Sequence, residues 1–254
     1  MQKKMIISML SFSLFIMIIE CGCSSIPEPD FLTKVPSKCM ASNEKEQIKD
    51  KNLSDQSAGL GWSYLADYFN KTSFVEAVNE SNLAYAMRDF NYCWSFNSEN
   101  YQAYWGAGVV RGVQATLTDD YTLAEKYLQQ SVEFMQMAMK HQVPDSQLNH
   151  LRLDMANAYN GLGAFYRQQG KKALSATNLD QAQTLLRQVI EKDPENGRAY
   201  YLLAATAFYQ ERYPEAERLA KLAQKKHFKV PDDFLQDIAG KLKDNNRNIT
   251  TAKE

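Results

Sequence analysis

The sequence is poor in the residues that most often bind metal ions, with 4 Cys and 3 His among 254 residues. His141, His150 and His227 lie far apart, and none stands at a metal-ligand spacing from a cysteine or a carboxylate. Two of the cysteines, Cys21 and Cys23, follow an apolar N-terminal run. We therefore expect neither a metal ion nor another cofactor.

Motifs of the common catalytic sites are also missing from the sequence. There is no glycine-rich phosphate loop, no Gly-x-Ser-x-Gly turn and no His-Glu-x-x-His pair. Two acidic doublets, at residues 119–120 and 232–233, precede helical patterns and are better explained as helix caps. We expect a protein that is not an enzyme.

The chain has no excess of charge of either sign. Lys and Arg number 29, Asp and Glu number 30, and the net charge is −1. Acidic and basic residues are interspersed, so the strong positive field that nucleic-acid binding requires is lacking. We expect no nucleic-acid partner.

Long apolar runs are confined to the N-terminus. A basic start at residues 1–4 precedes a predominantly apolar run of fifteen residues, 5–19. The run suffices for the core of a signal peptide but is short for a membrane span. A retained single-pass anchor and a plain secretory signal cut within residues 21–25 are the alternatives to a lipid-attachment signal. In each case the mature chain is exported.

Residues 193–223 contain the clearest helical pattern. In a first helix the apolar positions recur at spacings of three, four and seven, which places them on one face: Tyr200, Leu203, Ala204 and Ala207. A second helix carries small residues at Ala216, Ala220 and Ala223, which let two antiparallel helices approach closely. Pro194 supplies the break before the pair.

This pattern resembles the tetratricopeptide repeat, in which an aromatic residue, Leu-Gly or Leu-Ala, two further alanines and a terminal proline recur. Three upstream segments fit the same register, beginning at Trp62, Tyr104 and Tyr159. The copy at Tyr104 is the weakest, with Arg111 where an apolar residue is usual. The resemblance spans residues 58–228 and implies an all-α fold, an α-solenoid of about four helical hairpins. A generic helical bundle is the alternative.

The expected domain boundaries follow from these segments. They are a signal peptide at residues 1–22, a lipid-anchored tether at 23–56, a repeat domain at 57–243 and a disordered tail at 244–254. Phe234, Leu235, Ile238 and Leu242 predict a final amphipathic capping helix.

The copies differ in the distance from the first aromatic residue to the crossing alanine of the second helix. It is sixteen in the last copy, from residue 200 to 216, but twenty-four (62 to 86), twenty (104 to 124) and twenty-three (159 to 182) in the others. The extra residues are expected either to form insertions at one edge of the repeats or to lengthen the helices. Both interpretations stay open.

The resemblance implies a partner-binding groove lined by first-helix residues that face away from the paired helix. These are Gln102, Trp105, Asn157, Asn160, Arg167, Gln168, Arg198, Tyr201, Phe208 and Tyr209. Their amides can hydrogen-bond an extended peptide, and their aromatic rings offer apolar sites. The alternative is that some of these rings pack under a neighbouring hairpin.

The end of the apolar N-terminal run is similar to a bacterial lipoprotein signal, in which a small residue precedes the acylated cysteine. Cys23 after Gly22 fits, whereas Glu20 stands where an aliphatic residue is usual. The resemblance implies acyl chains on Cys23 and, with Ser24 next, an outer-membrane location facing the periplasm. A soluble periplasmic or secreted protein is the alternative.

Together these features predict a membrane-anchored adaptor or scaffold that binds a protein partner and assists assembly of an envelope complex. A non-catalytic regulator of a cell-wall enzyme and a structural surface lipoprotein without a groove ligand are the alternatives. Cys93 is expected to be a buried thiol or to form a disulfide with Cys39.

Overall fold

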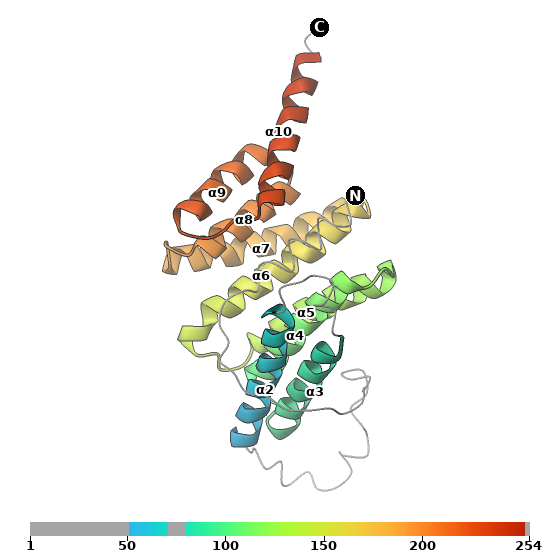
Figure 1. The fold of residues 1–254 in the computed structure, drawn as a ribbon, viewed down its shortest axis with the longest axis vertical. Helices are drawn as coiled ribbons and strands as arrows, with labels where there is room; N and C mark the ends of the chain where they lie inside the picture. Colours follow the sequence, from blue (N-terminus) through green and yellow to red (C-terminus); the bar gives the residue numbers. More distant parts are fainter. Residues whose placement is uncertain (1–50, 71–79, 252–254) are drawn as a thin grey trace. The chain divides into compact units, whose positions relative to one another are not determined.

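A computed structural model describes residues 51–70 and 80–251 of the chain. These residues form nine α-helices and no β-strand (Figure 1). The helices are α2 (Lys51–Asn70), α3 (Glu80–Phe96), α4 (Tyr101–Leu117), α5 (Tyr121–Ala138), α6 (Asp145–Gln168), α7 (Lys172–Lys192), α8 (Gly197–Tyr209), α9 (Tyr213–Lys225) and α10 (Asp232–Thr251). The all-α prediction is confirmed. The predicted signal peptide, Cys23 and residues 24–50 lie outside the described residues.

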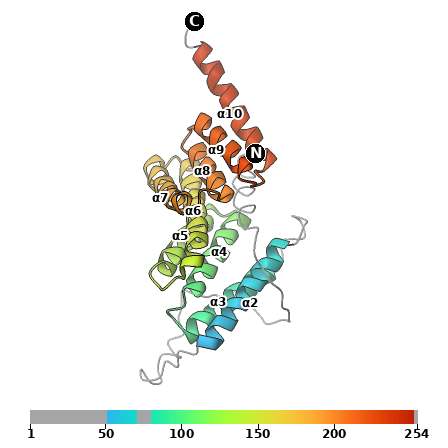
Figure 2. The same cartoon turned by 90° about the vertical axis from the view of Figure 1, so that its left-hand side faces the viewer.

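The helices belong to two compact units, each of which is built from hairpins. In the N-terminal unit, residues 51–145, α2 packs on α3 and α4 packs on α5. In the C-terminal unit, residues 146–251, α8 packs on α9, and α10 packs on α9. Two views at right angles show α10 continuing past α8 and α9 (Figure 2). The predicted hairpins and the final capping helix are confirmed.

Short polar side chains start several of these helices. Asn100 accepts the backbone N–H of Gln102 at the start of α4, and Asp120 accepts those of Thr122 and Leu123 at the start of α5. Such caps satisfy N–H groups that have no partner within the helix. At α10 the first turn itself holds two acidic residues, and the Asp233 carboxylate accepts the N–H of Phe234.

Glycine lets the paired helices approach until side chain meets backbone. The Ser131 hydroxyl donates to the carbonyl of Gly108 at 2.7 Å, joining α5 to α4. The Ser175 hydroxyl donates to the carbonyl of Gly163 at 2.8 Å, joining α7 to α6. The same contact therefore sets the crossing in one hairpin of each unit.

This contact corrects the expected register of α7. Ser175 lies sixteen residues after Tyr159, which is the spacing found from residue 200 to 216 in the last copy. Ser175, and not Ala182, is thus the first small residue of the crossing. The extra residues lengthen the N-terminal end of α6 and the C-terminal end of α7, away from their turn. The prediction of an insertion at that turn is wrong.

In the hairpin of α4 and α5 the extra residues do lie toward the turn, but they are helical. Ser131 follows Gly108 by 23 residues, whereas Ser175 follows Gly163 by 12. The difference of eleven is about three helical turns, and only residues 118–120 separate the two helices. The alternative of longer helices is correct here. The corresponding residues of the first copy, 71–79, lie outside the described residues.

Two predicted domain boundaries need correction. Helix α2 begins at Lys51, so residues 51–56 belong to the packed domain. Ser54 is fully buried; it donates to the carbonyl of Cys93 at 2.9 Å and accepts from Asn100 Nδ2 at 2.9 Å. A serine held by distant polar partners leaves no apolar signal in the sequence. Helix α10 extends to Thr251, past the predicted start of a disordered tail at residue 244.

Cys93 is a buried free thiol beside these residues. Burial raises its pKa to about 11, which keeps the thiol protonated at neutral pH. Cys39, the other member of the suggested disulfide, lies outside the described residues.

Substitution of Gly106 tests the packing of the N-terminal unit. A Cβ atom at Gly106 would lie 2.1 Å from the ring of Phe90, which is 1% exposed. We expect Gly106→Ala to lower the free energy of unfolding by about 1–3 kcal/mol in urea denaturation. Gly59→Ala is the matched control because nothing lies within 4 Å of its Cβ position. Helix propensity should make that variant up to about 1 kcal/mol more stable. Equal stabilities for the two variants would refute this packing.

Candidate functional site

The candidate site is the predicted groove face of the two first helices of the C-terminal unit, α6 and α8. Each of these helices is followed by a turn of the same backbone type. The N–H of Lys171 bonds the carbonyl of Tyr166 at 2.9 Å, and the N–H of Arg212 bonds that of Ala207 at 2.8 Å. Each turn needs one residue with left-handed φ. The first turn uses Gly170.

The second turn places Glu211, with φ of 63°, where the preceding hairpin has glycine. A non-glycine residue in this conformation is disfavoured by its Cβ atom. Glu211 Oε1 forms an ion pair with Arg167 at 2.5 Å. The turn thus carries a carboxylate to the end of the groove face.

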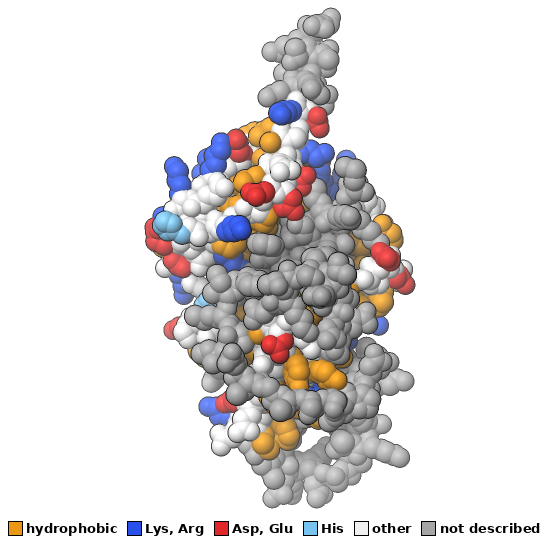
Figure 3. Space-filling view, in the orientation of Figure 1, with side chains coloured by type: hydrophobic (Ala, Val, Ile, Leu, Met, Phe, Trp, Pro, Cys, Tyr) orange, Lys and Arg blue, Asp and Glu red, His pale blue; other side chains and the backbone are white. Residues whose placement is uncertain are grey.

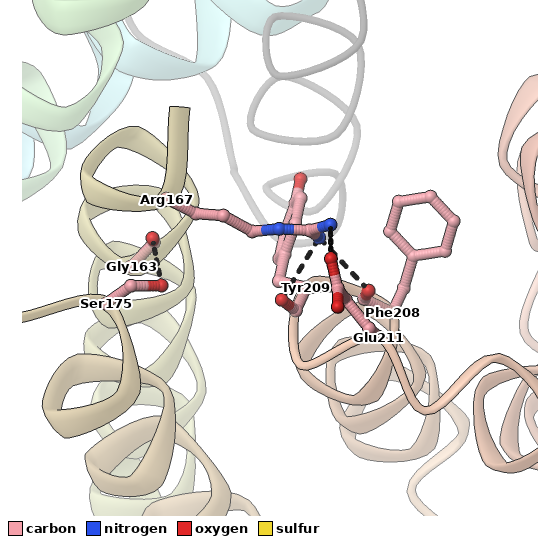
Figure 4. Close-up of polar contacts among 6 residues, drawn as sticks. All are labelled: Gly163, Arg167, Ser175, Phe208, Tyr209 and Glu211. Atoms are coloured by element: carbon pink, nitrogen blue, oxygen red, sulfur yellow. Dashed lines mark hydrogen bonds and ion pairs between the residues drawn. The ribbon is translucent and has the colours of Figure 1, made fainter. Parts of the chain in front are cut away.

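Arg167 joins the C-terminal ends of α6 and α8 (Figure 4). One guanidinium nitrogen, NH1, donates to the carbonyl of Tyr209 at 3.1 Å and to that of Phe208 at 3.5 Å. These carbonyls belong to the last turn of α8, where a positive charge is favoured. The Phe208 carbonyl also accepts the N–H of Glu211 at 3.0 Å. Arg167 therefore caps α8 from the neighbouring hairpin.

Two more polar contacts join the same helices nearer their N-terminal ends. Arg198 NH2 forms an ion pair with Asp154 Oδ1 at 2.5 Å. Asn160 Nδ2 donates to the carbonyl of Leu202 at 3.1 Å, and its Oδ1 accepts from the Thr206 hydroxyl at 2.9 Å. Asn160 is 3% exposed. We call these contacts, with those of Arg167, the α6–α8 polar contacts.

The aromatic groove residues of α8 are core residues. Tyr201 is 1% exposed; its ring stacks on Phe228 at 5.1 Å and meets Phe234 of α10 edge-on at 5.6 Å. Phe208 is 2% exposed and also contacts Phe234, at 5.6 Å. Burial raises the pKa of Tyr209. The prediction that these rings offer apolar sites to a partner is wrong, because α10 and the segment before it cover them.

The groove residues of the N-terminal unit show the same pattern. Trp105 is 7% exposed, with Trp62 edge-on at 5.1 Å and Tyr101 stacked at 6.3 Å. Packing between neighbouring helices therefore explains Trp105 as well. Gln102 is half-buried.

Four of the predicted residues in the C-terminal unit keep polar groups near solvent or without a partner. Gln168 is exposed, and Arg167 and Arg198 are half-buried. Asn157 is 7% exposed, and its side chain makes no hydrogen bond within the described part of the chain. These four residues remain the candidate binding residues.

Sequence reasoning missed the partners of these side chains. Asp154, Thr206 and Glu211 complete the α6–α8 polar contacts. Of the three, only Glu211 could have been singled out from the sequence, because it occupies the turn position at which the preceding hairpin has Gly170. Asp154 and Thr206 lie 44 and 46 residues from the side chains they contact, and no periodicity relates them.

The described residues offer little to other kinds of site. No group of three or more His, Cys, Asp or Glu side chains there could hold a metal ion. None of the helices described is long and apolar enough to cross a membrane. Over α9 and α10, Lys and Arg side chains lie beside Asp and Glu side chains (Figure 3). The groove face offers hydrogen-bond donors and acceptors, the chemistry of a binding surface.

Both hairpins of the groove face are similar to a known protein family. Residues 154–225 match the tetratricopeptide repeat family model. The match begins within α6 and ends at the last residue of α9, so it covers both hairpins that carry the α6–α8 polar contacts. Repeats of this kind serve protein–protein interaction. No curated protein sequence matches the chain.

Removal of a ring from α8 tests whether the groove aromatics belong to the core. We expect Tyr201→Ala to cost about 3–5 kcal/mol of unfolding free energy, because two packed rings lose their partner. Gln168→Ala, on the same predicted face but exposed, should change stability by no more than about 0.5 kcal/mol. Urea denaturation of both variants measures this, and a Tyr201→Ala protein as stable as wild type would refute the core assignment.

Proposed function

We propose that this protein is an adaptor that binds a protein partner on the groove face of α6 and α8 and is held at the bacterial envelope by a lipid on Cys23. The observation that carries the proposal is the set of groove-face polar groups, Asn157, Arg167, Gln168 and Arg198, within the residues that match the tetratricopeptide repeat. Repeats of this family supply rigid helices that present such side chains.

The membrane location rests on the sequence alone. Residues 5–19 are predominantly apolar, and Gly22 followed by Cys23 is similar to a lipoprotein attachment site. A thioether-linked diacylglyceryl group plus an amide-linked acyl chain would exceed the two signals that stable anchoring requires. The proposed location is the periplasmic face of the outer membrane, with the partner belonging to an envelope complex. Regulation of a cell-wall enzyme and a purely structural role are outcomes of the test below.

Exchange of single cysteines tests the anchor. We expect Cys23→Ala to move the protein from the membrane to the soluble fraction, because the acylated sulfur is lost. Cys21→Ala is the matched control and should remain in the membrane with a lipid-modified N-terminal peptide. Fractionation and mass spectrometry measure both properties. A Cys23→Ala protein that stays in the membrane with an unmodified N-terminus would refute lipid anchoring.

Crosslinking in envelope membranes tests partner binding. Gln168→Arg places a bulky charge on the groove face, whereas Gln169→Arg places it one residue later, in the turn after α6. We expect one envelope protein to be recovered with wild type and Gln169→Arg and to be lost with Gln168→Arg. A cell-wall enzyme as that protein would identify the regulator. Recovery of no protein that responds to Gln168→Arg would contradict the adaptor function and favour a structural role.

A further inference from the structure

Helix α2, the first helix described, exposes two leucines on its outer surface. Leu53 is 42% exposed, and Leu60, seven residues later, is 45% exposed. A spacing of seven places both side chains on the same side of a helix, about 10 Å apart along its axis. The buried side of α2 is a different one and contains Ser54, Ala58 and Leu65. The two leucines thus form a second apolar row, which we call the Leu53–Leu60 row.

The surface beside this row is open. Nothing lies within 4 Å of a Cβ atom placed at Gly59, the residue before Leu60. Gln56, one helical turn earlier, is exposed as well. A segment of chain can therefore lie along the row without displacing a described side chain.

The row is too small to hold a separate protein. A stable protein–protein interface uses about 20–30 residues from each partner, whereas the row offers two large apolar side chains. The same limit applies to a second copy of this chain. A segment joined to α2 by a short linker is different, because its effective concentration at the row is on the order of millimolar. The occupant that suits so small an area is part of the same chain.

The residues that precede α2 in the sequence contain one suitable segment. Phe31, Leu32 and Val35 are large apolar residues within five positions, and prolines stand on both sides of them, at positions 29 and 36. Proline restricts the residue before it to extended backbone, so the sequence favours an extended segment. From residue 31 to residue 35 such a segment spans about 13 Å, which matches the length of the Leu53–Leu60 row.

The linker between this segment and α2 is long enough for the contact. Residues 36–50 number fifteen, and fifteen extended residues reach about 50 Å. A flexible chain of that length has an end-to-end distance of about 20 Å. The row is about 10 Å long, so the linker can return the segment to α2 without being stretched.

We propose that residues 31–35 pack on the Leu53–Leu60 row of α2 in the same chain. The contact removes apolar side chains of both partners from water, which is the main source of its stability. It involves no charged group of the row and needs no acyl chain. A second copy of the chain and a separate protein are the competing occupants of the row.

The contact has a consequence for the reach of the protein, which rests on the proposed lipid on Cys23. Without the contact, twenty-eight residues lead from Cys23 to Lys51, where α2 begins, and they reach about 95 Å when extended. With it, eight residues lead from Cys23 to Phe31, and they reach about 28 Å. The contact therefore keeps the N-terminal unit close to the membrane.

Trypsin digestion of the purified full chain in detergent tests the contact. Lys34 lies within the segment and Lys45 lies in the linker, so one digestion reports on both. We expect Leu60→Glu, which places a charge in the row, to raise the cleavage rate after Lys34 about tenfold, because cleavage follows the population of the released segment. The rate after Lys45 should not change. Leu174→Glu is the matched control: Leu174 is 48% exposed on α7, and its exchange should alter neither rate.

A photoreactive phenylalanine analogue at position 31 identifies what the segment contacts. On irradiation we expect a crosslink within one chain, mapped by mass spectrometry to residues 53–60. Its yield should fall about tenfold in Leu60→Glu and should stay unchanged in Leu174→Glu, since the crosslink reports the same bound population. Both variants are first required to have the urea midpoint of wild type; if Leu60→Glu fails, Leu60→Ser replaces it.

Equal cleavage rates after Lys34 in wild type and Leu60→Glu would overturn the proposal. Crosslinks from position 31 to a second copy, to another protein or to no part of α2 would overturn it as well. Its failure is distinct from failure of the proposed function. Cys23→Ala should keep both the slow cleavage after Lys34 and the crosslink to α2. If Cys23 proves to carry no lipid while both results hold, only the effect on the distance to the membrane is lost.

Discussion

The close crossing of paired helices at glycine is the contact on which the rest of the structure depends. At Gly108 and at Gly163 the neighbouring helix lies near enough for a serine hydroxyl to bond the glycine carbonyl. A Cβ atom at Gly163 would lie 2.7 Å from Leu179, so a larger residue would push the helices apart. This contact fixes how each hairpin presents its first helix, and hence which side chains reach the groove face.

Within the C-terminal unit, polar contacts then decide which groove residues are structural. Asn160, Arg167 and Arg198 each form a hydrogen bond between α6 and α8. Tyr201 and Phe208 of α8 are covered by Phe228 and Phe234. A face that resembles a binding surface in sequence is therefore largely used to hold adjacent hairpins together. The exposed Gln168 and the half-buried Arg167 and Arg198 keep polar groups near solvent on this face.

The sequence was sufficient for the elements that depend on local periodicity. Apolar spacing predicted the hairpins, and short polar residues such as Asp120 predicted helix starts. It failed where the deciding contact is distant in the chain. Ser54 is held by Cys93 and Asn100, so its place in the domain left no apolar signal.

Small residues misled the prediction in a different way. Ser175 and Ala182 are both small and both buried in α7, and either fits a helix crossing. Only the hydrogen bond to Gly163 decides between them. The groove residues were placed on the right face by spacing, but spacing carries no information about Phe234 above Tyr201 or Asp154 beside Arg198.

The difference between Asn160 and Asn157 can be measured directly in the full chain, without a partner, by hydrogen exchange of the side-chain amides in NMR. The structure predicts slow exchange for the Asn160 Nδ2 protons, one of which is bonded to the Leu202 carbonyl. It predicts clearly faster exchange for those of Asn157. Equal rates, or slower exchange at Asn157, would mean that Asn157 is also held within the chain, and would contradict the assignment of its amide to ligand binding.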